Sequence, residues 1–326
     1  MLQHLPIFAA VLLLSTAAVT TNPDPMSQAA VQFKNSLTKE QRKELCLPFL
    51  GDERANWSVL PYGEAGVRFS ALHKEPREAL MVLLGTALSK EGLRTVSMVR
   101  ELDRILVTRE AAAGQSSKFH GPERYFVTLY GDPTGLDPWG WRFEGHHLSL
   151  NVTHKNGAWT SIAPFYVGSQ PAHVQEGEYK GLRLVGPEDD LARDLYKSLS
   201  AKQQARATLS GPQPGNVVML PKRKTIDDRG GIPWSELNEG QRKNLTSIVD
   251  LWIGRRSEDL ATVREKHLLE TQLEKLSFGW SGSPKPDAAH YWRIFGAGLT
   301  VEHSAPEADP NHVHTLWRDE HDYLGR

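Results

Sequence analysis

The sequence predicts an α+β protein made of two similar αβ halves, each with helices followed by an antiparallel β-hairpin or sheet. Three observations favour this class. Apolar residues recur at helical spacing in the first hundred residues. Segments rich in β-branched and aromatic residues, separated by Gly, Pro and Asp, follow from residue 125. The same succession then returns in the second half of the 326 residues.

The first half is expected to contain three helices and then three strands. Leu, Val and Phe return every three or four residues in the expected helices, at 27–50, 75–88 and 93–107. The expected strands follow at 125–130, 139–153 and 158–167. The turn between the first two strands, Gly131-Asp-Pro-Thr-Gly-Leu-Asp-Pro138, carries the residues that favour tight turns. These two strands are therefore expected to form a hairpin.

The hairpin is also the clearest part of an internal repeat, at a constant offset of 151 residues. Trp141-Arg142 corresponds to Trp292-Arg293, and Gly131-Asp-Pro133 corresponds to Gly282-Ser-Pro284. We therefore expect two halves, 26–175 and 176–326, that pack pseudo-symmetrically as one compact unit. The alternative is ordinary alternation of helices and strands without duplication. A junction between two halves is a frequent place for a binding site.

Composition narrows the partners and the type of metal site. Lys and Arg number 38 against 39 Asp and Glu, so nothing in the charge favours nucleic acid or an anionic membrane surface. Nine Trp residues favour an ordered protein. Cys46 is the single cysteine, which excludes an intramolecular disulfide and a Cys-rich zinc cluster. The oligomeric state is left open by the sequence.

The N-terminus has the features of a secretory signal peptide. Leu5 to Val19 form an apolar run that ends in small residues, so residues 1–25 are predicted to be the signal, with cleavage within 18–25. The run is too short for a comfortable transmembrane helix. We expect an exported protein, periplasmic or extracellular, with a retained N-terminal anchor as the alternative.

The C-terminus is dense in functional side chains. His312 and His314 lie two residues apart, and on a strand such residues point to the same side. Two imidazoles on one side can clamp a divalent metal ion. Arg318, Asp319 and His321 follow closely. The alternatives are a solvated polar tail or histidines satisfied by hydrogen bonds in a turn.

Two blocks carry a resemblance to a known family. Trp141-Arg-Phe-Glu-Gly-His-His-Leu-Ser-Leu-Asn151 and Asn311-His-Val-His-Thr-Leu-Trp-Arg-Asp319, with Asp322-Tyr323, are similar to the most distinctive blocks of the domain-of-unknown-function family numbered 3500. The resemblance covers nearly all of the mature chain. It implies an exported protein with one shared architecture, and it brings no activity. The family has Asn before the Asp-Tyr pair, whereas this chain has His321, which puts a role for that position in doubt.

Strand alternation suggests how the candidate residues meet. His147 shares a side with Ser149 and Asn151, whereas His146 shares the other side with apolar residues. The offset of 151 aligns Glu302 with Asn151. We therefore expect His147 of one half to meet Glu302 of the other, beside His312 and His314, with His146 as a further candidate ligand.

Such a set of imidazoles and one carboxylate holds zinc, iron or copper. Glu302 is a candidate ligand or the base for a metal-activated water. Arg318 suits an anionic substrate group or an oxyanion, and Asp319 suits a carboxylate that orients a ligand histidine. The metal candidates are His312, His314, His147 and His146, and the catalytic candidates are Glu302, Arg318 and Asp319. The other histidines are not assigned to the site.

The first functional hypothesis is an exported metal-dependent enzyme acting on a small or anionic molecule, with hydrolysis placed ahead of oxidation. The second is a non-catalytic exported protein that binds a small anionic ligand or a metal. The third is a structural polar cluster that ties the C-terminus into the sheet.

Overall fold

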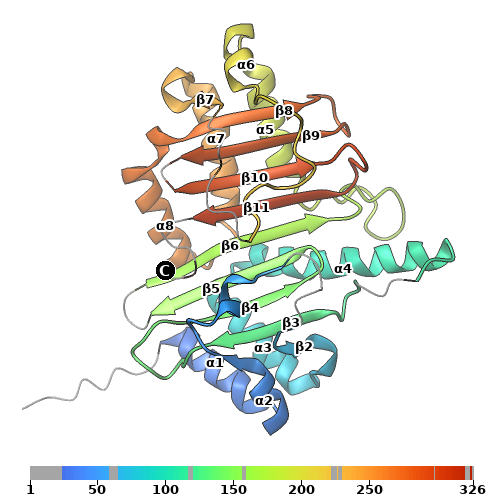
Figure 1. Cartoon of the computed structure of the whole chain (residues 1–326), viewed down its shortest axis with the longest axis vertical. Coiled ribbons are helices and arrows are strands. Elements are labelled where there is room, and N and C mark those ends of the chain that lie inside the picture. Colours follow the sequence, from blue (N-terminus) through green and yellow to red (C-terminus); the bar gives the residue numbers. More distant parts are fainter. Residues whose placement is uncertain are drawn as a thin grey trace, which may run out of the picture.

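The computed structural model describes residues 24–58, 65–116, 120–155, 159–221, 226, 230–296, 298–319 and 324. Within these residues, eleven strands form one mixed sheet with helices against it, so the predicted α+β class is confirmed (Figure 1). The predicted signal peptide, 1–25, lies outside the described residues except at its last two positions. No helix of the described chain combines the length and apolar character needed to cross a bilayer.

The strands run in the order β1-β3-β4-β5-β6-β11-β10-β9-β8-β7, with β2 also paired with β3. Their bounds are β1 Cys46–Leu47, β2 Val67–Arg68, β3 Tyr125–Tyr130, β4 Trp139–Gly145, β5 Leu148–Lys155, β6 Trp159–Ser169, β7 Ile232–Pro233, β8 Ser277–Gly282, β9 His290–Gly296, β10 Leu299–Ala305 and β11 Val313–Asp319. The centre of the sheet is the antiparallel pair of β6 and β11, where Phe165–Ser169 face Val313–Trp317. The two halves of the chain are thus joined in one continuous hydrogen-bonded sheet.

The α-helices are α1 Pro25–Ser36, α2 Lys39–Leu45, α3 Lys74–Ala87, α4 Lys90–Ala112, α5 Gly186–Ser198, α6 Ala201–Ala207, α7 Glu239–Ile253 and α8 Glu258–Thr271. Short 3-10 helices lie at Asp52–Ala55, Phe69–Ala71, Trp234–Glu236 and Leu273–Lys275. The expected helix over 27–50 is wrong in its length. Thr38 forms a capping box with Gln41, which starts the new helix α2 just after α1 ends.

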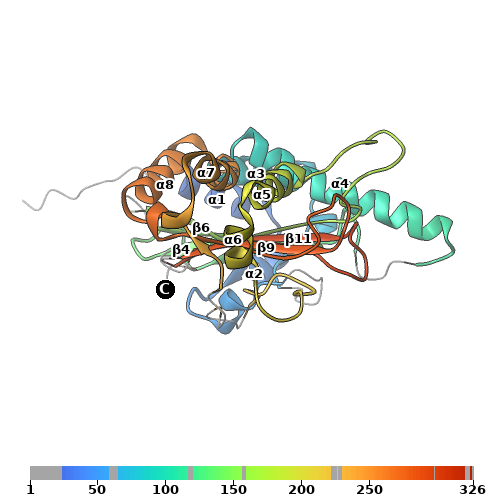
Figure 2. The same ribbon diagram turned by 90° about the horizontal axis from the view of Figure 1, so that it is seen from above.

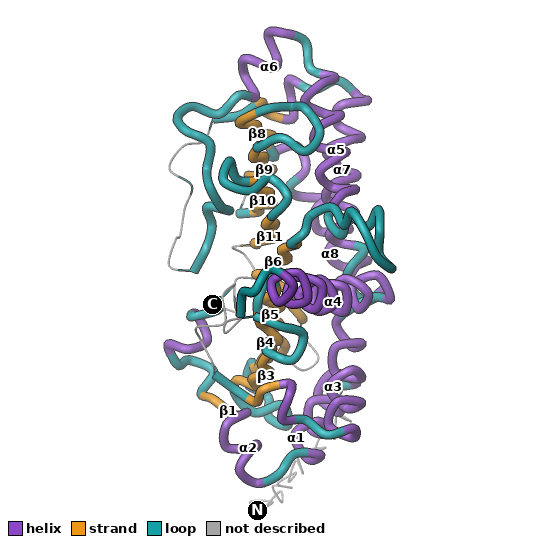
Figure 3. Tube along the Cα trace, turned by 90° about the vertical axis from the view of Figure 1, so that its right-hand side faces the viewer, coloured by secondary structure: helices purple, strands orange, loops and turns teal. Residues whose placement is uncertain are grey.

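The longer helices α1, α3, α4, α5, α7 and α8 gather on one side of the sheet, and α2 and several loops lie on the other (Figure 2). Seen along the strands, the sheet is a thin layer, and α4 lies beside β5 and β6 with its axis pointing toward the viewer (Figure 3). Trp252 of α7 packs on Phe165 of β6 and on Trp317 of β11, with ring centroids 5.6 and 6.3 Å apart. Since these three side chains are fully buried, the helix-covered side holds the main core at the middle of the sheet.

One correction to the predicted strands moves two candidate residues. The expected single strand over 139–153 is instead the pair β4 and β5, connected by a two-residue turn at His146 and His147. His147 adopts the left-handed backbone conformation, with φ 62°. The two histidines therefore lie at the end of a hairpin, and strand alternation does not decide where they point.

Candidate metal centre

Three histidine side chains from both halves of the chain converge at the middle of the sheet. His147 comes from the turn between β4 and β5, His312 from the residue before β11, and His314 from β11 itself. The Nε2 atom of His312 lies 2.7 Å from Nε2 of His147 and 2.9 Å from Nε2 of His314. These three nitrogens form one of the groups in the described chain whose geometry could hold a metal ion. The sequence-based expectation that His147, His312 and His314 meet thus agrees with the structure.

A glycine on the neighbouring strand makes room for the ring of His147. Gly168 of β6 is the cross-strand partner of His314, and its N–H donates to the carbonyl oxygen of His147 at 2.7 Å. A Cβ atom at position 168 would lie 2.5 Å from Cδ2 of His147. The His147 ring therefore lies directly over the bare backbone of β6, beside His314. The left-handed backbone of His147 adds strain of about 1–3 kcal/mol, which the surrounding contacts must hold in place.

The ring of His314 is oriented by an amide. Its Nδ1 lies 2.8 Å from Oδ1 of Asn216, which is only an acceptor, so Nδ1 carries the proton and donates it. The neutral ring then presents the lone pair of Nε2 to His312. A hydrogen bond at the far nitrogen is the usual way in which proteins fix a metal-binding tautomer. Asn216 was not identified from the sequence, because it lies in an irregular segment 98 residues before His314.

Burial keeps the three rings neutral. Desolvation lowers the pKa of His312 to about 4 and that of His314 to about 3, from 6.5. Burial and then the nearby His146 ring lower the pKa of His147 well below 6.5. At neutral pH all three imidazoles are therefore uncharged, which is the state that binds a metal ion.

His146 lies behind the three converging nitrogens. Its ring stacks on that of His147 with centroids 3.7 Å apart, and its Nδ1 lies 2.6 Å from Oδ1 of Asp103 in α4. The buried hydroxyl of Tyr125 donates to the other oxygen of Asp103 at 2.8 Å. His146, His147 and Asp103 also form a possible metal-binding group. Nevertheless, the contacts of His146 with Asp103 and with the His147 ring are those of a residue that holds the turn.

Glu302 and Arg318 lie on the same side of the sheet as His314 but bind a loop. Both carboxylate oxygens of Glu302 accept main-chain N–H groups, one from Val218 and one from Met219. Arg318 Nη1 donates to the carbonyl oxygen of Met219 at 3.2 Å. Glu302 belongs to none of the possible metal-binding groups of the described residues. The structure therefore does not bring these two side chains into the histidine group.

Asp319 points to the opposite side of the sheet. It forms an ion pair with Arg264 of α8 and is 1% exposed. Because side chains alternate along β11, Asp319 lies across the sheet from His314 and does not orient it. Asn151, which the offset of 151 residues aligns with Glu302, accepts at Oδ1 from Arg142 Nε at 2.9 Å. His321 lies outside the described residues.

A buried apolar cluster lies beside His314 on the same side of the sheet. It consists of Trp57, Tyr166, Val217, Met219 and Leu316. The ring of Tyr166 lies beside that of His314, with centroids 5.5 Å apart. The Tyr166 hydroxyl is buried without a hydrogen-bond partner in the described chain, and burial raises its pKa well above 10. The sequence alone did not single out this neutral phenol beside His314.

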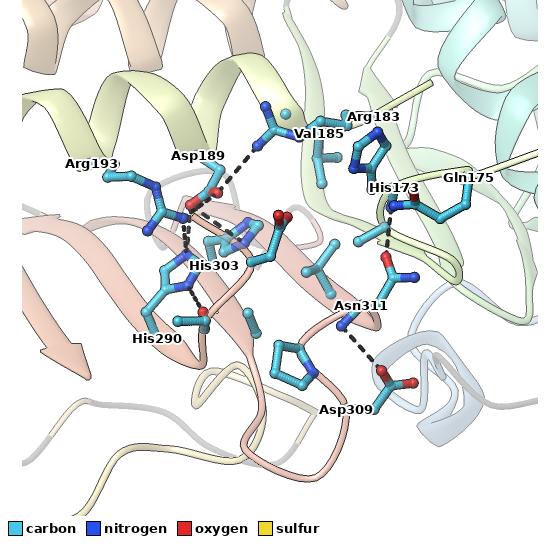
Figure 4. Close-up of a pocket in the computed structure, with 17 residues that line it drawn as sticks. His173, Gln175, Arg183, Val185, Asp189, Arg193, His290, His303, Asp309 and Asn311 are labelled. Atoms are coloured by element: carbon cyan, nitrogen blue, oxygen red, sulfur yellow. Dashed lines mark hydrogen bonds and ion pairs between the residues drawn. The ribbon is translucent and has the colours of Figure 1, made fainter. Parts of the chain in front are cut away.

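A separate polar group occupies the helix-covered side. Asp189, His290 and His303 line a cavity of about 310 Å³ between α5 and the ends of β9 and β10 (Figure 4). These histidines were not assigned from the sequence. Alternation within the β9–β10 hairpin could have placed them together, because His303 pairs with Trp292, two residues after His290. No sequence pattern links Asp189 to these histidines, because it lies in a helix about a hundred residues away along the chain.

The comparisons with known proteins give a family. A model of a family described as protein of unknown function (DUF3500) matches residues 20–325, nearly the whole chain. Neither the curated proteins nor the solved structures gave a match.

Proposed function

The chain belongs to this family of proteins of unknown function, and from its geometry we propose that it is a metal-dependent enzyme. The ion is bound by Nε2 of His147, His312 and His314. The observation that carries the proposal is the approach of these three nitrogens, at 2.7 and 2.9 Å around His312. His312 Nε2 lies within hydrogen-bonding distance of both other nitrogens, and all three ligand atoms lie within 4.8 Å of one another, a spacing that one ion with bonds of about 2.0–2.1 Å can draw together.

Three features of the surroundings support a bound ion rather than a plain hydrogen-bonded cluster. The depressed pKa values leave the rings neutral. A neutral imidazole has one N–H, and that of His314 is already donated to Asn216. With all three rings neutral, at most one of the two contacts at His312 Nε2 is therefore a full N–H···N hydrogen bond, and the other contact is left unsatisfied or repulsive. A cation at the centre removes that repulsion.

As the type of reaction, we propose hydrolysis ahead of oxidation. Zinc bound by three imidazoles keeps a fourth position open and activates a water there. The Tyr166 phenol, whose pKa burial raises well above 10, stays neutral beside His314 and would act there as a hydrogen-bond donor to a bound group. Iron and copper also accept imidazole ligands, and with either of them the chemistry would be oxidative.

We propose that Glu302 and Arg318 are positioning residues. Both hold the main chain of residues 218–219, and Asn216 in the same segment orients His314. A small anionic substrate remains part of the proposal, because Arg318 is a buried cation on the same side of the sheet as the histidines. Asp319 is proposed to act only through its ion pair with Arg264.

We also propose that the two halves, 26–175 and 176–326, arose by duplication. Both contain, in order, a helix pair, a two-residue strand with a 3-10 helix, two further helices and four strands. The sheet order β3-β4-β5-β6 is followed by β11-β10-β9-β8, which is the reverse order of the corresponding strands. Thr38 and Ser200 cap the corresponding helices α2 and α6 with the same capping box. These correspondences favour a pseudo-two-fold relation at the β6–β11 pair, where the metal centre lies.

Export remains a proposal as well. The apolar run at residues 5–19 supports a signal, and Asp24 supports cleavage before it. Asp24 caps α1 and its Oδ2 lies 2.9 Å from Nε2 of His154 in β5, so the mature fold needs this residue. The mass of the N-terminal peptide of secreted protein tests this proposal. If residues 1–19 are still present in the protein, the alternative of a retained N-terminal anchor is favoured.

The decisive experiment is metal analysis of untagged protein by mass spectrometry. The double variant His312→Ala, His314→Ala should lose one equivalent of ion that wild type and a control variant retain. His73→Ala is the control, because His73 is exposed and belongs to none of the possible metal-binding groups of the described chain. Absence of metal from every preparation, with unchanged stability in the double variant, would contradict the proposal. An anion bound near Arg318 without metal would favour the non-catalytic binding protein instead.

A further inference from the structure

We propose that the protein has a second metal site, formed by Asp189, His290 and His303 on the helix-covered side of the sheet. Its ligand set is two imidazoles and one carboxylate, which suits a divalent transition metal, iron(II) above all, with coordination positions left open. The site shares no residue with the three-histidine centre. It therefore stands or falls independently of the function proposed above.

The three ligand atoms are close enough for a single ion. Oδ1 of Asp189 lies 2.6 Å from Nε2 of His290 and 3.9 Å from Nε2 of His303. One ligand atom from each residue lies within 4.8 Å of the others. An ion about 2.0–2.2 Å from each atom requires ligand separations of about 3 Å, so small side-chain rotations complete the site.

Surrounding contacts select the atoms that would bind. Nδ1 of His290 donates to the carbonyl oxygen of Ala288 at 2.7 Å, so Nε2 is the nitrogen left for a metal. An ion there would replace the Nε2 proton that His290 donates to Asp189, and Arg193 Nη2 lies 3.4 Å from the same nitrogen. Arg193 Nη2 donates to Oδ2 of Asp189 at 2.7 Å, which directs Oδ1 toward the histidines. Burial would raise the pKa of Asp189, but the hydrogen bond with His290 and the neighbouring positive charges lower it below its usual range. The carboxylate is therefore ionised, as a ligand must be.

His303 is the residue that most needs a partner. It is 1% exposed, and neither ring nitrogen has a hydrogen-bond partner among the described residues. Its ring stacks between those of Trp292 and His290, at centroid distances of 5.4 Å to each, so it cannot turn outward. Because buried polar groups are normally satisfied, an imidazole held rigidly in this way beside a carboxylate points to a missing ligand.

The cavity provides access and room for a further ligand. Its volume of about 310 Å³ exceeds what one ion needs, and its far wall carries His173, Arg183 and Asn311 (Figure 4). The Arg183 side chain is 34% exposed and lies at 3.5 Å from Asp189, where its charge can attract an anionic group. Asn311 lines this cavity and the next residue, His312, belongs to the other centre. The loop between β10 and β11 thus separates the two sites.

The test uses the full, untagged chain, loaded with iron(II) without oxygen or with zinc, then desalted and analysed for bound metal. Wild type should hold two ions per chain. His303→Phe should hold one, because phenylalanine keeps a flat ring between Trp292 and His290 and removes the ligand nitrogen. The variant with Ala at both His312 and His314 should hold the other one. His73→Phe, at an exposed position, should keep both.

Thermal unfolding supplies a second measurement that controls for folding. Without metal, His303→Phe should unfold at or above the wild-type temperature, because it removes two buried polar atoms without partners. Added metal should raise the midpoint of the double variant, in which only the second site is left, and should not raise that of a variant combining all three substitutions.

Equal metal content and equal metal-induced shifts with and without His303→Phe would overturn the proposal. A shift produced by phosphate alone would overturn it too, in favour of an anion site at the arginines. A wild type with a single ion, lost in His303→Phe and kept in the double variant, would refute only the function proposed above.

Discussion

Gly168 of β6 and His147 of the turn between β4 and β5 lie directly against each other. The main-chain N–H of Gly168 donates to the His147 carbonyl oxygen at 2.7 Å, and the His147 ring occupies the space that a side chain at 168 would fill. The pairing of β5 with β6 brings the hairpin to this strand, and the bare backbone at Gly168 lets the His147 ring lie over it, beside His314.

Gly168→Ala is expected to push the His147 ring out of line and to abolish metal binding at the three-histidine centre. The overpacking should cost about 1–3 kcal/mol of unfolding free energy. Urea unfolding and metal analysis measure the two effects. Gly85→Ala is the control, because a Cβ there meets no atom within 4 Å and the residue lies in α3. It should stabilise the helix by about 0.5–1 kcal/mol and leave the metal content unchanged.

Asn216→Ala should weaken metal binding by about 10–100-fold, because it removes the acceptor that fixes the tautomer of His314. Competition with a chelator of known affinity measures the change. Asn216→Asp should recover most of the affinity, since a carboxylate also accepts the Nδ1 proton. An equal loss in both variants would show that the amide acts through packing and not through the tautomer.

As pH falls, the metal-free protein should begin to lose stability at a higher pH than protonation of its carboxylates alone would cause. The pKa of His312 is about 4 in the folded chain, and those of His314 and His303 are about 3, against 6.5 without burial. Between pH 6.5 and about 4 the unfolded chain binds protons that the folded chain does not, so the free energy of unfolding falls as pH falls. Each unit of lowered pKa corresponds to about 1.4 kcal/mol at the low end of this range. Urea unfolding at pH 8, 7, 6 and 5 measures the slope.

The variant with Ala at both His312 and His314 is the control for this slope. It should lose less stability than wild type between pH 7 and 5, because two of the depressed pKa values are gone. A wild-type stability that rises toward pH 5 would contradict the neutral state of these rings.

Glu302→Gln should destabilise the fold by about 1–3 kcal/mol and leave the metal content intact. One of the two N–H groups of Val218 and Met219 loses its acceptor, because an amide has only one oxygen. Hydrogen exchange should then be faster at residues 217–219. Glu144→Gln is the matched control in the first half, where Glu144 accepts from the Ser58 N–H at 2.9 Å. It should leave exchange at 217–219 unchanged. Loss of metal from Glu302→Gln with unchanged exchange at residues 217–219 would instead make Glu302 a ligand.

Most helices and strands of this protein can be predicted from local sequence patterns. The place where the two halves of the sheet meet cannot. Helical spacing and turn residues predicted α3, α4, β3 and the hairpin that follows. The hairpin end at His146 and His147 was missed because only Gly145 marks it, and a histidine in the left-handed conformation is uncommon. The order of strands across β6 and β11 depends on long-range pairing, which leaves no trace in the spacing of either strand.

The candidate site divides in the same way. His312 and His314 could be found because strand alternation links them directly. His147 joined them through a weaker argument, the polar character of its neighbours, and the ring reaches the site through a turn. Asn216, Asp189 and Tyr166 could not be found, because an irregular loop, a helix and a strand bring them to the sites by tertiary packing alone.

The outermost strands of the sheet have a consequence for how the protein behaves in concentrated solution. β1 and β7 are each only two residues long, and β7 includes Pro233, which has no N–H to donate. A sheet of this width would expose long rows of unpaired amide groups if it ended on full strands. Ending instead on two such short strands leaves little template for the sheet of another molecule. The wide sheet that aligns the candidate metal ligands is thereby protected against edge-to-edge aggregation.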